Sequence, residues 1–180
     1  IGDAKASWGI TEGNPIHHAI KHIAFRTGVD FSVDVTINRD HKITGVYAGE
    51  LFAVHKAACQ SAKGIAMQKV NKPFDVVLTT NSGYPLDQNL YQAVKGMSAA
   101  AQVVKKGGII ICAAECSDGI PDHGDYSKIL ASKNSPEELL ELINDSNYNR
   151  HDQWQVQIQA QIQTHAEVLV KSDYLTQEQV

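Results

Sequence analysis

Residues 74–96 of this 180-residue chain read FDVVLTTNSGYPLDQNLYQAVKG, and they set the expected fold. The first seven residues form an apolar, β-branched run that predicts a buried strand. The Asn-Ser-Gly-Tyr-Pro segment that follows ends this strand with turn-forming residues. We expect a helix over residues 87–104 and a second strand over residues 108–114. Together they form a βαβ unit, whose strands should be parallel and whose crossover should be right-handed.

Elements on both sides of this unit extend an α/β pattern. Asn14-Pro15 opens a helix that ends at Gly28 and is expected to bury four apolar residues, Ile16, Ala19, Ile20 and Ile23. The other expected elements are a hairpin of two strands, two helices and a final strand, over residues 31–37, 43–47, 51–67, 135–145 and 166–171. The predicted fold class is α/β, a three-layer Rossmann-like domain with a mixed, mainly parallel sheet.

Residues 153–163 read QWQVQIQAQIQ and support two predictions. Strict alternation of apolar residues with glutamine is typical of a half-buried strand. Glutamine is also a good helix former, and Trp154, Ile158 and Ile162 recur at the four-residue spacing of one helix face. No hairpin turn lies between residues 163 and 166. We predict a helix, with a strand as the alternative.

The start of the helix after residue 87 carries the side chains most suited to chemistry. Asp87 or Asn89 can cap this helix. Unpaired N–H groups at a helix start, with a lysine nearby, form a site for a carboxylate or phosphate. Ligands of α/β sheets bind beyond the carboxyl ends of the strands, which favours this site over a simply solvated surface helix. The polar side chains predicted to share one helix face are Gln88, Tyr91, Gln92 and Lys95.

Composition and charge favour a small soluble partner. The net charge of −4, from 16 basic and 20 acidic residues, is mild, so neither nucleic acid nor a membrane is an expected partner. No run reaches the length of a membrane span, and no signal-peptide pattern opens the chain. The odd cysteine count favours reduced thiols and a cytoplasmic protein.

Residues 1–13 are expected to link a missing N-terminal domain to a single α/β domain over residues 14–180, with both chain ends cut.

Eight histidines raise the question of a metal site. His18 and His22 have the i, i+4 spacing that can hold one ion on a helix face, but no third ligand is in view. Cys112 and Cys116 likewise lack companions for zinc. We therefore predict no metal site in this chain.

Gly107-Gly108 is expected to be a turn, and neither a nucleotide-binding glycine motif nor a nucleophile elbow is present, which disfavours a classical dehydrogenase or hydrolase.

A specific resemblance rests on the same loop and helix. The run from Gly83 to Gln92, followed by Val94-Lys95-Gly96, resembles the signature of the nickel-pincer lactate racemase family. Three further segments agree with it, namely Glu12-Gly13-Asn14-Pro15, Asp118-Gly119 and Asp152-Gln153-Trp154. Together they span most of the chain. The resemblance covers only the C-terminal domain of such an enzyme.

The resemblance implies a racemase or epimerase of 2-hydroxy acids that takes hydride from C2 of the substrate and returns it to either face. Its cofactor would be the nickel pincer nucleotide, a nickel complex of pyridinium-3,5-bisthiocarboxylic acid mononucleotide. In the family, the lysine that tethers the cofactor and the histidines that bind nickel or shuttle the proton belong to the preceding domain. No cofactor ligand or metal ligand is therefore expected in this chain, and the isolated chain is expected to be inactive.

The resemblance also implies roles for residues of the C-terminal domain. Lys95 corresponds to the family lysine that engages the substrate carboxylate, and Gln92 corresponds to its amide neighbour, so both are candidate catalytic residues. Tyr91 and Trp154 are expected to line the same substrate pocket, although Trp154 also suits a core position. The loop after Cys116 is a possible part of the cleft, through Asp118, Asp122 and His123.

The sequence leaves two questions open, the identity of the substrate and whether the chain is part of an enzyme. The loop from Ser117 to Gly124 is less glycine-rich than expected for a lactate-specific member, and we hypothesise that Asp122 and His123 contact a longer substrate. The alternative to an enzyme domain is a non-catalytic α/β module that binds a small carboxylate or packs against a partner domain.

Overall fold

The computed structural model describes residues 2–179. The chain divides into two compact units, which meet in sequence at Lys69 and Val70. We expected a linker over residues 1–13 and one domain over residues 14–180. The structure instead groups residues 2–69 in an N-terminal unit, so residues 14–69 belong with the segment predicted as a linker and not with residues 70–179.

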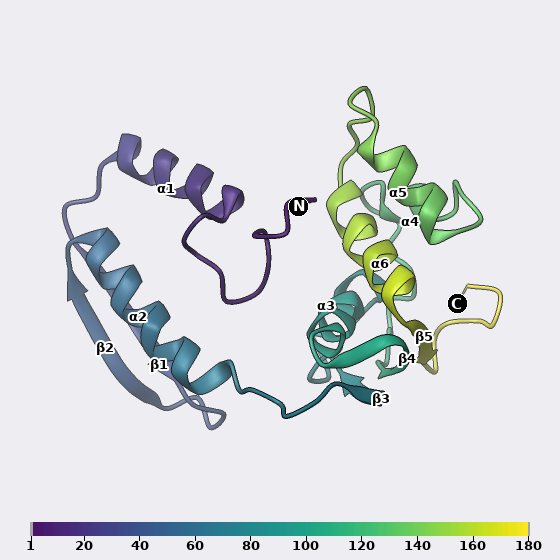
Figure 1. The fold of residues 1–180 in the computed structure, drawn as a ribbon, viewed down its shortest axis with the longest axis horizontal. Helices are drawn as coiled ribbons and strands as arrows, with labels where there is room; N and C mark the ends of the chain where they lie inside the picture. Colours follow the sequence, from purple (N-terminus) through teal and green to yellow (C-terminus); the bar gives the residue numbers. More distant parts are fainter. Residues whose placement is uncertain (1, 180) are drawn as a thin grey trace. The chain divides into compact units, whose positions relative to one another are not determined.

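The N-terminal unit confirms the helices and the hairpin predicted for it (Figure 1). Asn14 caps the first helix by accepting hydrogen bonds from the N–H groups of Ile16 and His17, and Gly28 ends it at a φ of 76°. The two strands pair antiparallel, and the second helix packs on both of them. The elements are α1 (Pro15–Thr27), β1 (Ser32–Ile37), β2 (Ile43–Gly49) and α2 (Leu51–Ala66).

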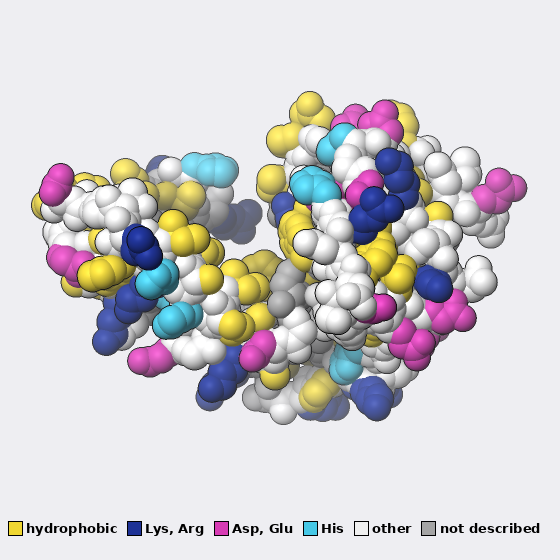
Figure 2. Space-filling view, turned by 90° about the horizontal axis from the view of Figure 1, so that it is seen from above, with side chains coloured by type: hydrophobic (Ala, Val, Ile, Leu, Met, Phe, Trp, Pro, Cys, Tyr) yellow, Lys and Arg dark blue, Asp and Glu magenta, His cyan; other side chains and the backbone are white. Residues whose placement is uncertain are grey.

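The apolar stripe of α1 is exposed, so the prediction that it is buried was wrong. Ile20 is 61% exposed and Ile23 is 65% exposed, and Ile16 and Ala19 are exposed as well. Within residues 2–69, α2 covers the hairpin, and no described element covers this face of α1. Figure 2 shows apolar side chains on the surface of this unit among its lysine, arginine and histidine side chains.

The C-terminal unit contains the predicted βαβ unit and continues beyond it (Figure 1). Its strands form one parallel sheet in the order β3-β4-β5, so the predicted parallel pairing is confirmed. The helix of the βαβ unit starts at Leu90, with Asn89 as its cap. The elements are β3 (Phe74–Thr80), α3 (Leu90–Ala101), β4 (Val104–Ala113), α4 (Tyr126–Leu130), α5 (Pro136–Asn144), α6 (Gln153–His165) and β5 (Glu167–Lys171).

The α/β class is confirmed, and the strands lie in two separate sheets rather than in one mixed sheet. Among the described residues, α3 and α6 pack on one face of the parallel sheet, and α4 and α5 pack on α6. β3 was predicted to be buried, but Val76 is 51% exposed and Leu78 is 72% exposed. The reason is that β3 is an edge strand and these side chains point away from the helices. The core lies between the sheet and α3, around Ala93, Val94, Met97, Ile110 and Cys112.

The helix prediction for residues 153–163 is confirmed by α6. The alternation with glutamine arises because α6 is surrounded by α3, α4, α5 and the sheet. Gln155, Gln157 and Gln159 are buried, and each finds a polar partner. Polar side chains on a helix with neighbours on several sides become buried, and they are tolerated there because their hydrogen bonds are satisfied.

β4 begins earlier than predicted, at Val104, and includes Gly107-Gly108, which was predicted to be a turn. Gly107 has a φ of 73°, and the pairing register with β3 shifts at this point, so the pair forms a bulge within the strand. A Cβ atom on Gly108 would lie 2.7 Å from the carbonyl oxygen of Asp75. The glycine therefore permits the close approach of the two strands.

Candidate functional site

The turn between β3 and α3 is held in shape by two asparagine side chains. The Nδ2 of Asn81 donates to the carbonyl oxygens of Leu86 and Gln92, and its distance to the Gln92 oxygen is 2.9 Å. The Oδ1 of Asn89 accepts from the N–H of Gln92 at 3.0 Å. Both backbone polar groups of Gln92 are therefore bound by side chains, which fixes the first turn of α3 at the carboxyl end of β3.

The N-terminus of α3 is not an open anion site, and this corrects the sequence-based expectation. The N–H of Leu90 donates to the carbonyl oxygen of Gly119 at 3.1 Å, and Asn89 occupies the N–H of Gln92. Leu90 is 3% exposed, so the helix start is covered. Lys95 lies more than one turn further along the helix. An anion beside Lys95 would therefore be bound by side chains and not by the N–H groups of the helix end.

Gln92 and Lys95 lie together on the exposed side of α3. The Nζ of Lys95 donates to the Oε1 of Gln92 at 2.5 Å. The Lys95 side chain is exposed, and Gln92 is half-buried. Since an ammonium only donates, the amide turns its oxygen to Lys95 and leaves its NH₂ group as a donor. A positive charge and an amide donor side by side suit a carboxylate.

The rings of Tyr91 and Trp154 are also in contact. Their ring centroids are 5.8 Å apart in an edge-to-face arrangement, and Tyr91 makes a similar contact with Tyr126 at 5.3 Å. Burial, together with the negative charge of Asp152, raises the pKa of Tyr91 above its ordinary value. Its phenol therefore stays neutral at physiological pH. Trp154 is 40% exposed, so one part of its ring contacts Tyr91 and another part faces solvent.

The loop after β4 meets the start of α3 through its backbone. The N–H of Asp118 donates to the carbonyl oxygen of Gln88 at 2.8 Å. Asp122 and His123 are exposed and contact each other at 3.9 Å. Within residues 2–179, neither makes a hydrogen bond or an ion pair with Lys95. The structure thus places Asp118 beside the helix start, and the substrate roles of the three residues stay predictions.

Asp87 is a buried residue of this region that sequence reasoning treated only as a possible cap. It is 5% exposed, and its Oδ2 accepts from the N–H of Glu115 at 3.0 Å. Its carbonyl oxygen accepts from the N–H of Cys116 at 2.9 Å. Its Oδ1 has no hydrogen-bond partner among the described residues. Asp87 joins the two loops at the carboxyl ends of β3 and β4, a role that no sequence spacing indicated.

The cysteines near this region are poor candidates for chemistry. Cys112 and Cys116 are both fully buried. Burial, with smaller effects from Cys116 and Asp87, raises the pKa of Cys112 to about 11. Burial also raises the pKa of Cys116. Both thiols are therefore protonated and unreactive at neutral pH.

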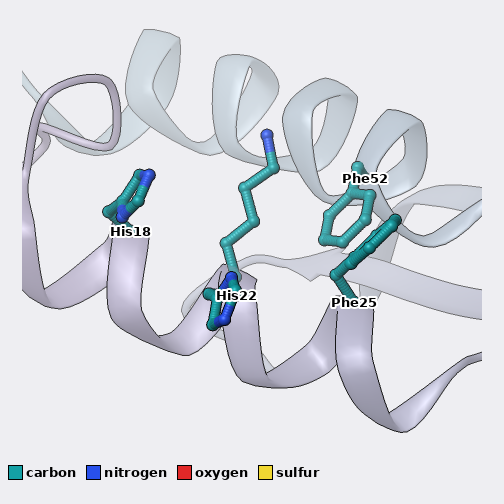
Figure 3. Close-up of a pocket in the computed structure, with 5 residues that line it drawn as sticks. His18, His22, Phe25 and Phe52 are labelled. Carbon is teal, nitrogen blue, oxygen red and sulfur yellow. The ribbon is translucent and has the colours of Figure 1, made fainter.

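A separate pocket lies in the N-terminal unit between α1 and α2. It has a volume of about 230 Å³ and is lined by His18, Lys21, His22, Phe25 and Phe52. Figure 3 shows the two imidazoles one turn apart on α1 and the two phenyl rings at the other end of the pocket. The described residues bring no three metal-ligating side chains together. The ammonium of Lys21 in the same pocket would also repel a cation.

None of the helices within residues 2–179 is long and apolar enough to cross a membrane.

Residues 69–180 match the profile of the family described as the lactate racemase C-terminal domain. The chain belongs to this family. It is 38% identical over 175 residues to a lactate racemase of Thermoanaerobacterium thermosaccharolyticum and 39% identical over 175 residues to one of Lactiplantibacillus plantarum. Each match covers 96% of this chain and 41% of the relative.

A solved structure agrees with these sequence matches. The lactate racemase apoprotein from Thermoanaerobacterium thermosaccharolyticum superimposes with a TM-score of 0.88 at 36% sequence identity. The similarity covers 95% of this chain and 41% of that protein, so both units have a counterpart in it. The family profile begins at the boundary between the two units, which identifies the C-terminal unit as the lactate racemase C-terminal domain.

Proposed function

We propose that this chain is part of a nickel-pincer-dependent 2-hydroxy-acid racemase or epimerase of the lactate type. Its C-terminal unit binds the substrate and closes the cleft over it. The observation that carries this proposal is the Gln92–Lys95 pair on the exposed side of α3, in a chain that belongs to the lactate racemase family. The protein is proposed to act in the cytoplasm on a small 2-hydroxy acid, together with an N-terminal domain and without nucleic acid or membrane partners.

Lys95 and Gln92 would hold the carboxylate of the substrate. The ammonium of Lys95 neutralises the carboxylate and holds it in place while the carbon beside it becomes a ketone. The NH₂ group of Gln92 donates a hydrogen bond in a fixed direction, because both its backbone groups and its amide oxygen are already bound. A fixed charge and a fixed donor orient C2 for reaction.

Tyr91 and Trp154 would form an apolar wall of the same pocket. Their edge-to-face contact keeps the Trp154 ring beside α3 while part of it faces outward. An indole over the bound acid excludes water, which strengthens the attraction between Lys95 and the carboxylate.

The proposed cofactor is the nickel pincer nucleotide, which when bound accepts hydride from C2 of the substrate and gives it back. Within residues 2–179 no three metal-ligating side chains lie together. By the resemblance, the lysine that tethers this cofactor and the histidine that binds its nickel belong to the domain that precedes this chain. The proposal therefore assigns cofactor binding to the N-terminal domain of the full-length enzyme, and not to the N-terminal unit of this chain. The residues of this chain act on the substrate.

The test is racemisation of a panel of 2-hydroxy acids by the cofactor-loaded full-length protein. We expect Lys95→Ala to lower kcat/KM by about tenfold to a hundredfold, as for the loss of a charged hydrogen bond. Lys105→Ala is the matched control, because Lys105 is an exposed lysine of β4 that pairs with Asp75, at the amino end of the strand. The isolated 180-residue chain is expected to be inactive. Cofactor binding without turnover of any acid would instead favour a non-catalytic carboxylate-binding module.

A further inference from the structure

The candidate site residues come from two helices, α3 and α6, and one buried side chain connects these helices. Gln92 and Lys95 lie on α3, whereas Trp154 lies at the start of α6. Gln155, the residue after Trp154, is 1% exposed. Its Nε2 donates to the carbonyl oxygen of Tyr91 at 2.6 Å. This hydrogen bond joins residues 64 positions apart in the chain.

The acceptor of this bond belongs to the turn of α3 that carries Lys95. In an α-helix the carbonyl of residue i accepts from the N–H of residue i+4, so the carbonyl of Tyr91 is also the helical partner of the Lys95 N–H. The ring of Tyr91 contacts the ring of Trp154. Tyr91 is therefore held to α6 twice, by Gln155 at its backbone and by Trp154 at its ring.

We propose that Gln155 is a positioning residue, which sets the place of Trp154 relative to Gln92 and Lys95. This proposal rests on the proposed function for its effect on turnover. The claim that Gln155 fixes the position of Trp154 does not depend on that function. A buried amide donor has a strong preference for one partner, because an unsatisfied donor in the core is costly. Removing the donor frees the start of α6 to shift along α3, and Trp154 moves with it.

A matched control lies two residues further along α6. Gln157 is also buried, at 8% exposure, but its Nε2 donates to the Oδ1 of Asn144 at 3.4 Å, on α5 and away from α3. Gln155→Met and Gln157→Met remove the same amide from the same helix and keep an unbranched side chain of similar size. A purely structural role would give the two variants similar effects on the site.

The experiment uses full-length protein labelled with fluorotryptophan, and Trp154→Phe identifies the fluorine NMR signal of Trp154. We expect Gln155→Met to shift or broaden this signal and Gln157→Met to leave it in place. In the cofactor-loaded enzyme, Gln155→Met should raise KM for the 2-hydroxy acid about fivefold, as for one lost hydrogen bond, whereas Gln157→Met should not. Gln155→Asn, whose shorter amide does not reach Tyr91, is a second variant in case Gln155→Met folds poorly.

The possible results separate the two proposals. An unmoved Trp154 signal in both Gln155 variants, or equal changes in Gln155→Met and Gln157→Met, would overturn the positioning role. If wild-type protein racemises no acid but the Trp154 signal still moves only in the Gln155 variants, the positioning role stands and the proposed function fails.

Discussion

The ammonium of Lys95 donates a hydrogen bond to the amide oxygen of Gln92, 2.5 Å away, on the exposed side of α3. This bond fixes which end of the Gln92 amide faces a ligand. The oxygen is taken, so the NH₂ group is the available donor. The pair therefore offers one charge and one directed donor to a carboxylate, and the two can be separated experimentally.

Gln92→Glu is expected to harm turnover more than Gln92→Ala. The alanine variant loses one donor and should lower kcat/KM about tenfold. The glutamate variant places a carboxylate against Lys95, cancels its charge and repels the carboxylate of the substrate, for a loss of about a hundredfold. Steady-state kinetics of the full-length enzyme measures both. Equal losses in the two variants would show that the charge of Lys95 is not used.

Asn89→Ala should destabilise the C-terminal unit, because the N–H of Gln92 loses its cap. The expected cost is about 1 kcal/mol of unfolding free energy, the usual value for a helix cap. Urea unfolding, followed by circular dichroism, provides the measurement. Asn134→Ala is the control, since Asn134 is exposed and uses its backbone N–H rather than its side chain in its contact with Glu138. A cost in the control as large as in Asn89→Ala would count against the capping role.

Asp87→Ala should destabilise the protein more than Asp87→Asn. Alanine leaves the N–H of Glu115 without its acceptor in a region where Asp87 is buried, at a cost of about 1 to 3 kcal/mol. Asparagine keeps one acceptor oxygen for the same N–H. Thermal unfolding of the two variants tests this order. The reverse order would mean that the carboxylate does not hold the Glu115 loop.

Unfolding free energy should fall as the pH rises from about 9 to about 11, partly because of Cys112. Its folded pKa is raised by burial to about 11 from an ordinary value of 9.0. Below pH 9 both states keep the proton, so the contribution is fully present. Between the two values only the unfolded chain releases the proton, and stability is lost with rising pH.

Cys112→Ala serves as the comparison for this pH dependence. Lysines and tyrosines titrate in the same range, so the informative quantity is the difference in unfolding free energy between wild type and the variant, measured at each pH. This difference should shrink as the pH rises from 9 to 11, the window set by the two pKa values. A constant difference would show that the Cys112 thiol is not protected from ionisation.

Elements with strong local signals could be predicted from the sequence. Asn14, Gly28 and Ser135 bound helices through contacts with residues only a few positions away, so α1 and α5 were placed correctly. The βαβ unit followed from an apolar run, a turn and a second apolar run. The short helix α4 was missed, because five residues give too little periodicity to detect.

The candidate site could be predicted only in part. The resemblance proposed Lys95, Gln92, Tyr91 and Trp154 as site residues, and their roles stay predictions. The structure shows two contacts among them, Gln92 with Lys95 and Tyr91 with Trp154. The expectation of an open helix end was wrong, because the carbonyl of Gly119 fills it from a loop that lies 29 residues further along the chain. No local pattern encodes such a long-range contact.

Helix caps, turns and strands depend on residues that are close together in the chain. The residue types in these segments were therefore enough to predict most of the secondary structure and the α/β class. Burial and polar pairing depend on which distant element packs against which. Tertiary packing therefore determined that the α1 stripe is exposed, that Asp87 and the α6 glutamines are buried, and that Gln155 binds Tyr91. The physical reason is that a buried polar group must find a partner in space, wherever in the sequence that partner lies.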